Sequence, residues 1–289
     1  AKMVVKAWEA DTLNYATTGS IDSSIKKLDK KEPNYFKKVQ NIIEDHAIEA
    51  SLCKVLGSEA LAFCSDETVQ IFGGAGFIEE YPAAALYRDE RINRIFEGTN
   101  EINRLLISSI LLKKTILEEL PIRDAIYQKS IKKPYEGLEE FKNDNHLSTE
   151  ITLIEDSRSI LLYTLHNLIN VYGQDLKNEQ WALEPLADIV MSFSVLYSGF
   201  LRYNQLTDDR LKDATLPILK YSINRNFNKI LSRSRDINNS INESLDDHSK
   251  ESYKSLIDSI DNHHYNCDVI SLKKTICEEF YKHGKYYLD

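Results

Sequence analysis

The sequence predicts an all-α protein built from two helical bundles. Apolar residues recur at three- and four-residue spacing along most of the 289 residues, which is the pattern of amphipathic helices. Short β-like runs such as residues 189–195 lie inside this helical pattern, so no strand is expected. Prolines, a glycine and many charges gather in residues 121–147, so we expect a linker there between domains at 1–120 and 148–289.

The first domain is expected to contain three long helices. The first covers residues 2–19 and ends at Gly19, and the second runs from 39 to 69 with its apolar positions on one face. The third covers residues 100–120 and ends before Pro121, because proline cannot continue a helix. Helical spacing begins with the first residues and no signal-peptide layout precedes it, so we expect this domain to be incomplete at its N-terminus.

The second domain is expected to be a bundle of four antiparallel helices. These helices are predicted at residues 149–172, 178–205, 214–235 and 248–282. An aspartate or serine just before a helix accepts hydrogen bonds from its first backbone N–H groups. Candidate caps of this kind are Asp144 or Ser148, Asp208, and Asp246 or Asp247.

Composition and charge exclude several classes of function. The net charge is −9, and no part of the chain is basic enough for a nucleic-acid module. No apolar run approaches the roughly 20 residues that cross a bilayer. The four cysteines show no CxxC spacing, which is typical of free thiols in a reducing compartment, so we expect a cytoplasmic protein.

One cluster has metal-binding residue types, namely His263, His264 and Cys267. Adjacent side chains point about 100° apart on a helix, so the two histidines cannot face one ion together. We therefore expect no metal site.

Glycines dominate the segment after the second long helix. Five of the ten glycines fall between residues 57 and 98, so residues 73–98 are expected to form a tight loop with a short helix near 83–87. A dinucleotide-binding fingerprint requires a strand before the glycines, and here a helix precedes them, so we reject that motif. Two interpretations remain open: a helix-to-helix turn that begins at Gly73, or paired glycines whose backbone approaches a phosphate.

Glu97 lies between Phe96 and Gly98, just before a predicted helix. An acidic residue there can serve structure alone, because it stabilises the positive end of the helix dipole next to a cap at Thr99 or Asn100. A carboxylate on a glycine hinge beside apolar side chains can also remove a proton from carbon once a ligand has expelled water. The residues by themselves leave both interpretations open.

Four short motifs follow one another in order. They read QIFGGAGF at 70–77, EEYP at 79–82, YRD at 87–89 and IFEGTNEI at 95–102. Together they resemble the C-terminal helical domain of the acyl-CoA dehydrogenase family, whose fold includes a four-helix up-and-down bundle, and the resemblance covers about residues 2–115. The region after residue 121 resembles the C-terminal extension of the very-long-chain type, with weaker motif support.

The resemblance implies an FAD-dependent oxidoreductase that introduces a double bond between the α and β carbons of a fatty acyl-CoA thioester, a step of fatty acid β-oxidation. Glu97 would be the general base that takes the α-proton while a hydride leaves the β carbon for the flavin. The backbone N–H of Glu97 would help to hold the thioester oxygen, which stabilises enolate-like charge.

The resemblance also assigns cofactor-binding residues. Gln70, Gly73 and Gly74 would contact the pyrophosphate region of an FAD held mainly by a neighbouring subunit. Thr99 and Glu101 would lie near the adenine half of an FAD, although the glutamate departs from the glutamine of some family members.

Substrate contacts and partners follow from the same resemblance. Phe96 would line the acyl pocket, and Gly98 would lie against the acyl-CoA substrate. An electron-transfer flavoprotein or a similar acceptor would take the electrons, and the protein would be a homo-oligomer. Arg88 and Asp89 are interpreted as a structural ion pair.

The N-terminal helical domain and the middle β domain of the family are not visible in this sequence. We therefore expect the chain alone to be inactive and to bind FAD weakly or not at all. The alternative function is a non-catalytic helical scaffold or assembly protein derived from such an enzyme. Apolar stripes at 161–165 and 193–197 are expected to pack in the bundle core rather than against a membrane.

Overall fold

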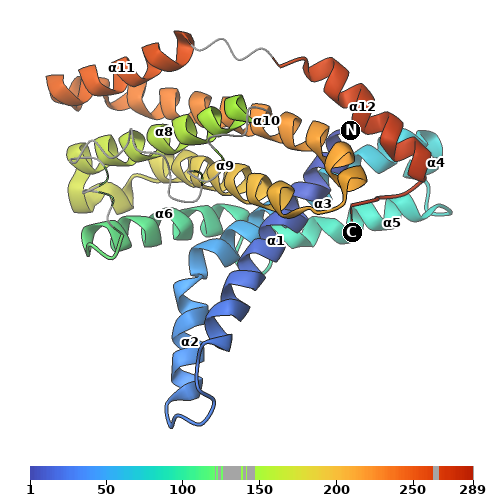
Figure 1. Ribbon diagram of the computed structural model, residues 1–289, viewed down its shortest axis with the longest axis horizontal. Coiled ribbons are helices and arrows are strands. Elements are labelled where there is room, and N and C mark those ends of the chain that lie inside the picture. The colour runs from blue at the N-terminus through green and yellow to red at the C-terminus, as the bar shows by residue number, and fades with distance from the viewer. Residues whose placement is uncertain are drawn as a thin grey trace. The chain divides into compact units, whose positions relative to one another are not determined.

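The computed structural model is helical, as the sequence predicts, and Figure 1 shows its elements. The structure describes residues 1–120, 147–262 and 267–288, together with Ile122, Ala125, Leu138 and Phe141, and no strand occurs among them. The chain divides into two compact units. The first comprises Ala1–Ile107 and Cys277–Asp289, and the second comprises Ser108–Ile276.

The first unit is built around helix α3, which packs against α1 and α5. Its elements are α1 (Lys2–Lys26), α2 (Tyr35–Asp45), α3 (Ala47–Phe72), α4 (Gly74–Phe77), α5 (Pro82–Glu90), the 3-10 turn η1 (Arg91–Arg94) and the first part of α6 (Asn100–Ile116). The apolar face of α3 is buried against that of α1, and the core of the unit includes Val5, Trp8, Leu13, Leu52 and Val55.

Two predicted helix boundaries in this unit are wrong. Helix α1 does not end at Gly19 but continues to Lys26. Nothing lies within 4 Å of where a Cβ of Gly19 would stand, and an interior glycine costs a helix only about 1 kcal/mol relative to alanine. The predicted helix 39–69 is two helices, because His46 between α2 and α3 has φ −94° and ψ 19°.

The segment after α3 agrees better with the prediction. The expected short helix near 83–87 is α5, and Pro82 stands at its first position, where a missing N–H costs nothing. Helix α6 begins at Asn100, as predicted, but ends at Ile116, before the predicted stop at Pro121. Glu118, in the turn that follows, has a positive φ of 58°, which no α-helix accommodates.

The second unit is a bundle in which α8, α9 and α10 lie side by side, with α11 packed against α8 (Figure 1). Its later elements are α8 (Ser148–Tyr172), the 3-10 turn η4 (Gly173–Asn178), α9 (Gln180–Gln205), α10 (Asp209–Ile241), the 3-10 turn η5 (Asn242–Ser244), α11 (Asp247–Asn262) and the first part of α12 (Val269–His283). Apolar side chains of the three central helices fill its core, among them Ile160, Leu165, Leu186, Phe200, Ile223 and Ile230.

Helix starts in this unit test the predicted caps. Asp208 Oδ1 accepts a hydrogen bond from the Arg210 N–H at 2.8 Å, so this cap is confirmed. Asp246 Oδ1 accepts one from the Ser249 N–H at 2.9 Å, which decides between Asp246 and Asp247. Ser148 is the first residue of α8 and makes no capping bond, and Asp144 lies outside the described residues.

Two predicted helices of this unit differ from the structure. Helix α10 begins at Asp209 rather than 214 and runs through Pro217, whose ring removes a single backbone hydrogen bond. The predicted helix 248–282 is two helices, α11 and α12. Asp268 caps the second of them, because its Oδ1 accepts a hydrogen bond from the Ser271 N–H at 3.0 Å.

A buried line of polar side chains, here called the polar seam, joins three helices of the second unit. The Oγ1 of Thr164 on α8 lies 2.7 Å from the Oγ of Ser234 on α10, which in turn lies 2.8 Å from the hydroxyl of Tyr253 on α11. Asn167 Nδ2 donates to Asn238 Oδ1 at 2.7 Å, and Asn238 Nδ2 donates back to Thr164 Oγ1 at 3.3 Å. Thr164 Oγ1 and Asn238 Nδ2 also donate to carbonyls of their own helices, Ile160 O and Ser234 O, whereas Asn167 Nδ2 and Asn238 Oδ1 pair across the helices.

Most of the predicted linker at 121–147 lies outside the described residues, so the division at 1–120 and 148–289 stays a prediction. His263 and His264 lie outside them too, and within the described ranges no group of His, Cys, Asp and Glu is arranged to hold a metal ion. All four cysteines are free thiols. No helix in the described part of the chain combines the length and the apolar character needed to cross a membrane.

Candidate functional site

Glu97 lies on an exposed loop between η1 and α6, in the first unit. Its backbone has φ 55°, the left-handed conformation that side chains other than glycine rarely adopt. Holding a non-glycine residue there costs about 1–2 kcal/mol, because the Cβ approaches the following carbonyl oxygen. Other contacts must therefore impose this conformation on the loop.

Asn103, one turn into α6, supplies the first of these contacts. Its side-chain Nδ2 donates to Gly98 O at 2.8 Å and to Thr99 O at 3.1 Å, with a weaker contact to Glu97 O at 3.4 Å. Gly98 itself has φ 78°, and a Cβ on it would stand 3.0 Å from that Nδ2. The loop thus curls tightly around a single amide, and position 98 requires glycine.

Lys54 of α3 holds the same loop from a second direction. Its Nζ donates to Gly98 O and to Asn100 Oδ1, both at 2.7 Å. Burial lowers the pKa of Lys54, and the nearby carboxylates of Glu101, Glu59 and Glu97 oppose that shift. The Lys54 ammonium group is therefore partly buried, with these three carboxylates near it.

Asn100 is buried beneath the loop, with 2% of its surface exposed. Its Nδ2 donates to Ser58 Oγ on α3 at 3.0 Å. Next to it, Arg104 Nη2 forms an ion pair with Glu59 Oε1 at 2.7 Å. The start of α6 is therefore fixed to the middle of α3 by buried polar contacts.

Thr99 is the side-chain cap of α6, because its Oγ1 accepts a hydrogen bond from the Ile102 N–H at 3.2 Å. This result decides between Thr99 and Asn100, the two predicted caps. The backbone N–H of Glu101 and the Thr99 hydroxyl donate hydrogen bonds to the Glu101 carboxylate and hold its pKa below the usual value. Both predicted cofactor residues thus have a structural role at the helix start.

Gln70, Gly73 and Gly74 lie exposed where α3 ends and α4 begins. The Gly73 N–H donates to Gln70 O at 3.2 Å, and Gly73 has φ 59°, so the helix-to-helix turn of the sequence prediction is present. Nothing lies within 4 Å of where a Cβ of Gly73 or Gly74 would stand. A Cβ on Gly76 would instead lie 2.5 Å from Val69 O, so that glycine serves close packing.

The structure does not bring all predicted site residues together. The residues that hold the Glu97 loop lie at positions 54, 58 and 59 of α3. Gln70 lies roughly 16 Å beyond Glu59 along the same helix, at about 1.5 Å of rise per residue. The candidate residues therefore form two separate groups, one at the middle of α3 and one at its end.

Large apolar side chains are exposed around both groups. Phe96, next to Glu97, is 48% exposed, and Phe77 of α4 is 81% exposed. Exposed apolar side chains in such number are typical of a surface that contacts a ligand or another protein. The others between residues 71 and 106 are Ile71, Phe72, Ile78, Tyr81, Leu86, Tyr87, Ile92, Ile95, Ile102 and Leu106.

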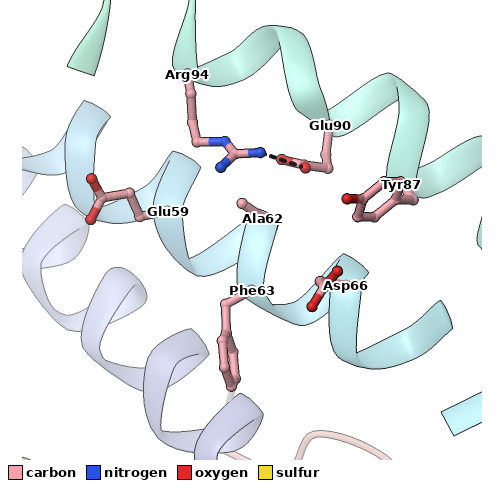
Figure 2. Close-up of a pocket in the computed structure, with 7 residues that line it drawn as sticks. All are labelled: Glu59, Ala62, Phe63, Asp66, Tyr87, Glu90 and Arg94. Atoms are coloured by element: carbon pink, nitrogen blue, oxygen red, sulfur yellow. Dashed lines mark hydrogen bonds and ion pairs between the residues drawn. The ribbon is translucent and has the colours of Figure 1, made fainter. Parts of the chain in front are cut away.

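A pocket of about 300 Å³ opens beside this region between α3 and α5 (Figure 2). Arg94 Nη2 lies 3.2 Å from Glu90 Oε1, and the Glu90 side chain is only 1% exposed. None of the predicted site residues lines this pocket. The lining residues are Glu59, Ala62, Phe63, Asp66, Tyr87, Glu90 and Arg94.

Sequence reasoning missed the residues that shape the loop, namely Lys54, Ser58 and Asn103. Lys54 and Ser58 are four apart and so share a face of α3, but no local signal connects that face with a loop some 40 positions later. The predicted ion pair between Arg88 and Asp89 is wrong. Arg88 Nη2 instead lies 2.6 Å from Glu79 Oε1.

The chain is similar to known proteins. Residues 27–112 match the family model of the acyl-CoA dehydrogenase C-terminal domain. A probable acyl-CoA dehydrogenase of Bacillus subtilis (strain 168) is 35% identical over 200 residues, which are 69% of this chain and 34% of that protein. The very long-chain specific acyl-CoA dehydrogenase of Rattus norvegicus mitochondria is 34% identical over 108 residues, 37% of this chain and 14% of that protein.

Solved structures show the same relationship. An acyl-CoA dehydrogenase from Bacillus anthracis, complexed with FAD, matches 99% of this chain and 48% of its own with a TM-score of 0.86 and 30% sequence identity. Acyl-CoA oxidase3 from Yarrowia lipolytica, at 15% identity and a TM-score of 0.58, shares the fold over 87% of this chain and 39% of its own. This chain thus spans about a third of the B. subtilis protein and about half of the B. anthracis chain. Residues 27–112 therefore belong to the acyl-CoA dehydrogenase family, as its C-terminal domain.

Proposed function

We propose that this chain is the C-terminal part of an FAD-dependent acyl-CoA dehydrogenase that oxidises fatty acyl-CoA thioesters, with Glu97 as the base that takes the α-proton. The observation that carries the proposal is the Glu97 loop itself. A carboxylate stands exposed on a strained backbone, and no hydrogen bond to it occurs among the described residues. Strain of this kind is typical of functional sites.

The surroundings of Glu97 support a role in proton abstraction. Its neighbour Phe96 presents an exposed apolar side chain to which an acyl chain could bind. Gly98, on the other side, has no side chain to cover the backbone next to Glu97. A base must reach its proton within hydrogen-bond distance, and removal from an α carbon is eased when a backbone N–H holds the thioester oxygen. The backbone N–H of Glu97 is the donor proposed for that oxygen, and Glu97 then takes the proton on its carboxylate.

Residues of both groups are the proposed contacts for FAD. The exposed backbone at Gly73 and Gly74, with open space where side chains would stand, leaves room for a phosphate group beside Gln70. Thr99 and Glu101 are the proposed contacts for the adenine half. When bound, FAD supplies the acceptor for the hydride that leaves the β carbon.

The exposed apolar side chains between residues 71 and 106 support the proposed partners. A surface of this kind is stabilised when another protein surface covers it, as in a homo-oligomer. The electrons would then pass to an electron-transfer flavoprotein or a similar acceptor. The acyl-CoA substrate would enter beside Phe96.

The test replaces Glu97 by glutamine in the flavin-loaded enzyme that carries this sequence. Glu97→Gln keeps the shape and removes the base, so we expect turnover of acyl-CoA with an artificial acceptor to fall by roughly 10²- to 10⁴-fold. Glu80→Gln, at another exposed glutamate, is the matched control and should retain turnover. Unchanged turnover in Glu97→Gln would refute the proposal and favour a non-catalytic helical scaffold.

A further inference from the structure

We propose that Asn103 is a positioning residue for Glu97: its side-chain amide holds the loop so that the carboxylate stays at the place where the reaction needs it. The inference rests on the proposed function, because it assumes that Glu97 is the base. Asn103 itself touches neither substrate nor cofactor in this proposal and acts only through the backbone of residues 97–99.

The first step is the convergence of three backbone carbonyls on one atom. The oxygens of Glu97, Gly98 and Thr99 all lie within 3.4 Å of Asn103 Nδ2. All three are acceptors, so only the amide nitrogen, and not the amide oxygen, can satisfy them. Successive carbonyls of an extended or helical backbone do not turn toward one point, so this arrangement requires the curled conformation of the loop.

The second step connects this curl with the strain at Glu97. The positive φ angles of Glu97 and Gly98, 55° and 78°, are the dihedral angles that turn these carbonyls inward. A glutamate would leave this conformation if nothing opposed the change. The amide of Asn103 opposes it, because relaxation of the loop would break its contacts with Gly98 O and Glu97 O in a residue that is only 8% exposed.

The third step is that two donors hold the loop from different helices. Lys54 Nζ also donates to Gly98 O at 2.7 Å, so one carbonyl is fixed both from α6 and from α3. With the carbonyl side of the loop held inward, the Glu97 side chain remains exposed. A displacement of about 1 Å at a reacting group can lower a rate by roughly 100-fold.

The experiment compares three variants of the 289-residue chain. Asn103→Ala removes the donor, and Asn103→Asp keeps the shape but can only accept hydrogen bonds. Asn93→Ala is the matched control, because Asn93 Nδ2 also donates to a backbone carbonyl, Glu90 O at 3.0 Å, outside the loop. Circular dichroism first establishes that each variant retains its helices.

NMR then measures the loop directly. We expect the backbone coupling constant and the intraresidue NOE of Glu97 to report a positive φ in the native chain and in Asn93→Ala. Both signals should change in Asn103→Ala and in Asn103→Asp, with faster amide exchange at Glu97 and Gly98. A native loop in Asn103→Asp would overturn the proposal, because donation by the amide would then not be the cause.

Kinetics of the flavin-loaded enzyme separate this proposal from the proposed function. If both are right, Glu97→Gln loses roughly 10²- to 10⁴-fold in turnover. Asn103→Ala then loses about 10- to 100-fold in kcat, the effect of a small misplacement, with KM for acyl-CoA nearly unchanged. Loss of activity in Glu97→Gln together with native kcat in Asn103→Ala would overturn the positioning role alone. Full activity in Glu97→Gln would overturn the proposed function, and the NMR result would still decide whether Asn103 holds the loop.

Discussion

At the scale of single residues, Glu97 combines a strained backbone with an exposed carboxylate. A glycine at this position would remove the strain, since glycine adopts positive φ without a Cβ clash. The residue at this position is nevertheless a glutamate. Stability would favour glycine there, whereas the proposed chemistry requires a carboxylate. Proteins accept such local costs where function requires a particular side chain.

The first prediction concerns the cost of the strain at Glu97 in the free energy of unfolding. Glu97→Gly should raise the free energy of unfolding of the chain by roughly 1 kcal/mol, because it removes the left-handed strain. Glu97→Gln keeps the strain and should leave that free energy within about 0.5 kcal/mol of the native value. Urea unfolding checks both, and equal stability of the two variants would contradict the strain argument.

The second prediction concerns Gly98. Gly98→Ala should lower the free energy of unfolding by about 1–3 kcal/mol, because φ is 78° and the added Cβ would stand 3.0 Å from Asn103 Nδ2. Gly19→Ala is the matched control with the opposite sign. Gly19 lies inside α1 in open space, so alanine there should stabilise the chain by about 0.5–1 kcal/mol. Thermal unfolding of the two variants in opposite directions would agree with both assignments.

The sequence points to the residue proposed as the base but not to the residues that hold its loop. Glu97 and Gly98 stand in a recognisable motif, because their types are dictated locally by chemistry and by backbone conformation. Asn103 and Lys54 act through contacts that exist only after α6 and α3 have packed. A lysine or an asparagine on a helix is usually a solvated residue, so the sequence carried no signal for these contacts.

At the scale of elements, caps were more predictable than boundaries. The acceptors Asp208 and Asp246 are recognisable because a single side chain decides the start of a helix. The continuation of α1 through Gly19 and the break at His46 were not predictable, because tertiary packing overrides weak local preferences. Helices α8 and α9 match the predicted ranges closely, since their apolar pattern is strong.

The third prediction concerns the start of α11 at low pH. Hydrogen bonds from the Ser249 N–H and hydroxyl hold the pKa of Asp246 below its usual value. A lowered pKa means that the ionised cap contributes stability above the unfolded pKa of about 4, and that this contribution is lost as the pH falls through the folded pKa. Amide exchange in the first turn of α11 should therefore accelerate below about pH 4.

The control for this acid effect is Asp246→Asn. Its amide oxygen can still accept the hydrogen bonds but does not titrate, so exchange at the start of α11 should lose that part of its pH dependence after correction for the intrinsic rate. Acid sensitivity that persists unchanged in Asp246→Asn would assign the effect to another group.

At the scale of the whole molecule, the chain consists of two compact helical units. The all-α class was predictable because helical periodicity extends along nearly the entire sequence. The grouping of residues 277–289 with the first unit was not, because it depends on contacts between the two ends of the chain. Sequence periodicity reports which face of a helix is buried and not which distant segment buries it.

The fourth prediction is that the 289-residue chain alone binds FAD weakly or not at all. Gln70, Gly73 and Gly74 are exposed at the end of α3, whereas the Glu97 loop is held by Lys54 nearer the middle of that helix, so the proposed contacts lie apart. Gel filtration of the chain with excess FAD, followed by an absorption spectrum, should show little flavin in the protein peak. A stoichiometric flavin spectrum would contradict this expectation.

The polar seam of the second unit limits how its helices can align. An apolar interface tolerates a slip of one helical turn, about 5.4 Å, because one aliphatic contact replaces another. In the seam such a slip would separate Asn167 Nδ2 from Asn238 Oδ1, and a buried polar group left unpaired costs about 1–3 kcal/mol. The contacts among Asn167, Asn238 and Thr164 thus favour a single axial register of α8 against α10. The surrounding apolar residues can then drift over evolutionary time while the topology of the bundle stays the same.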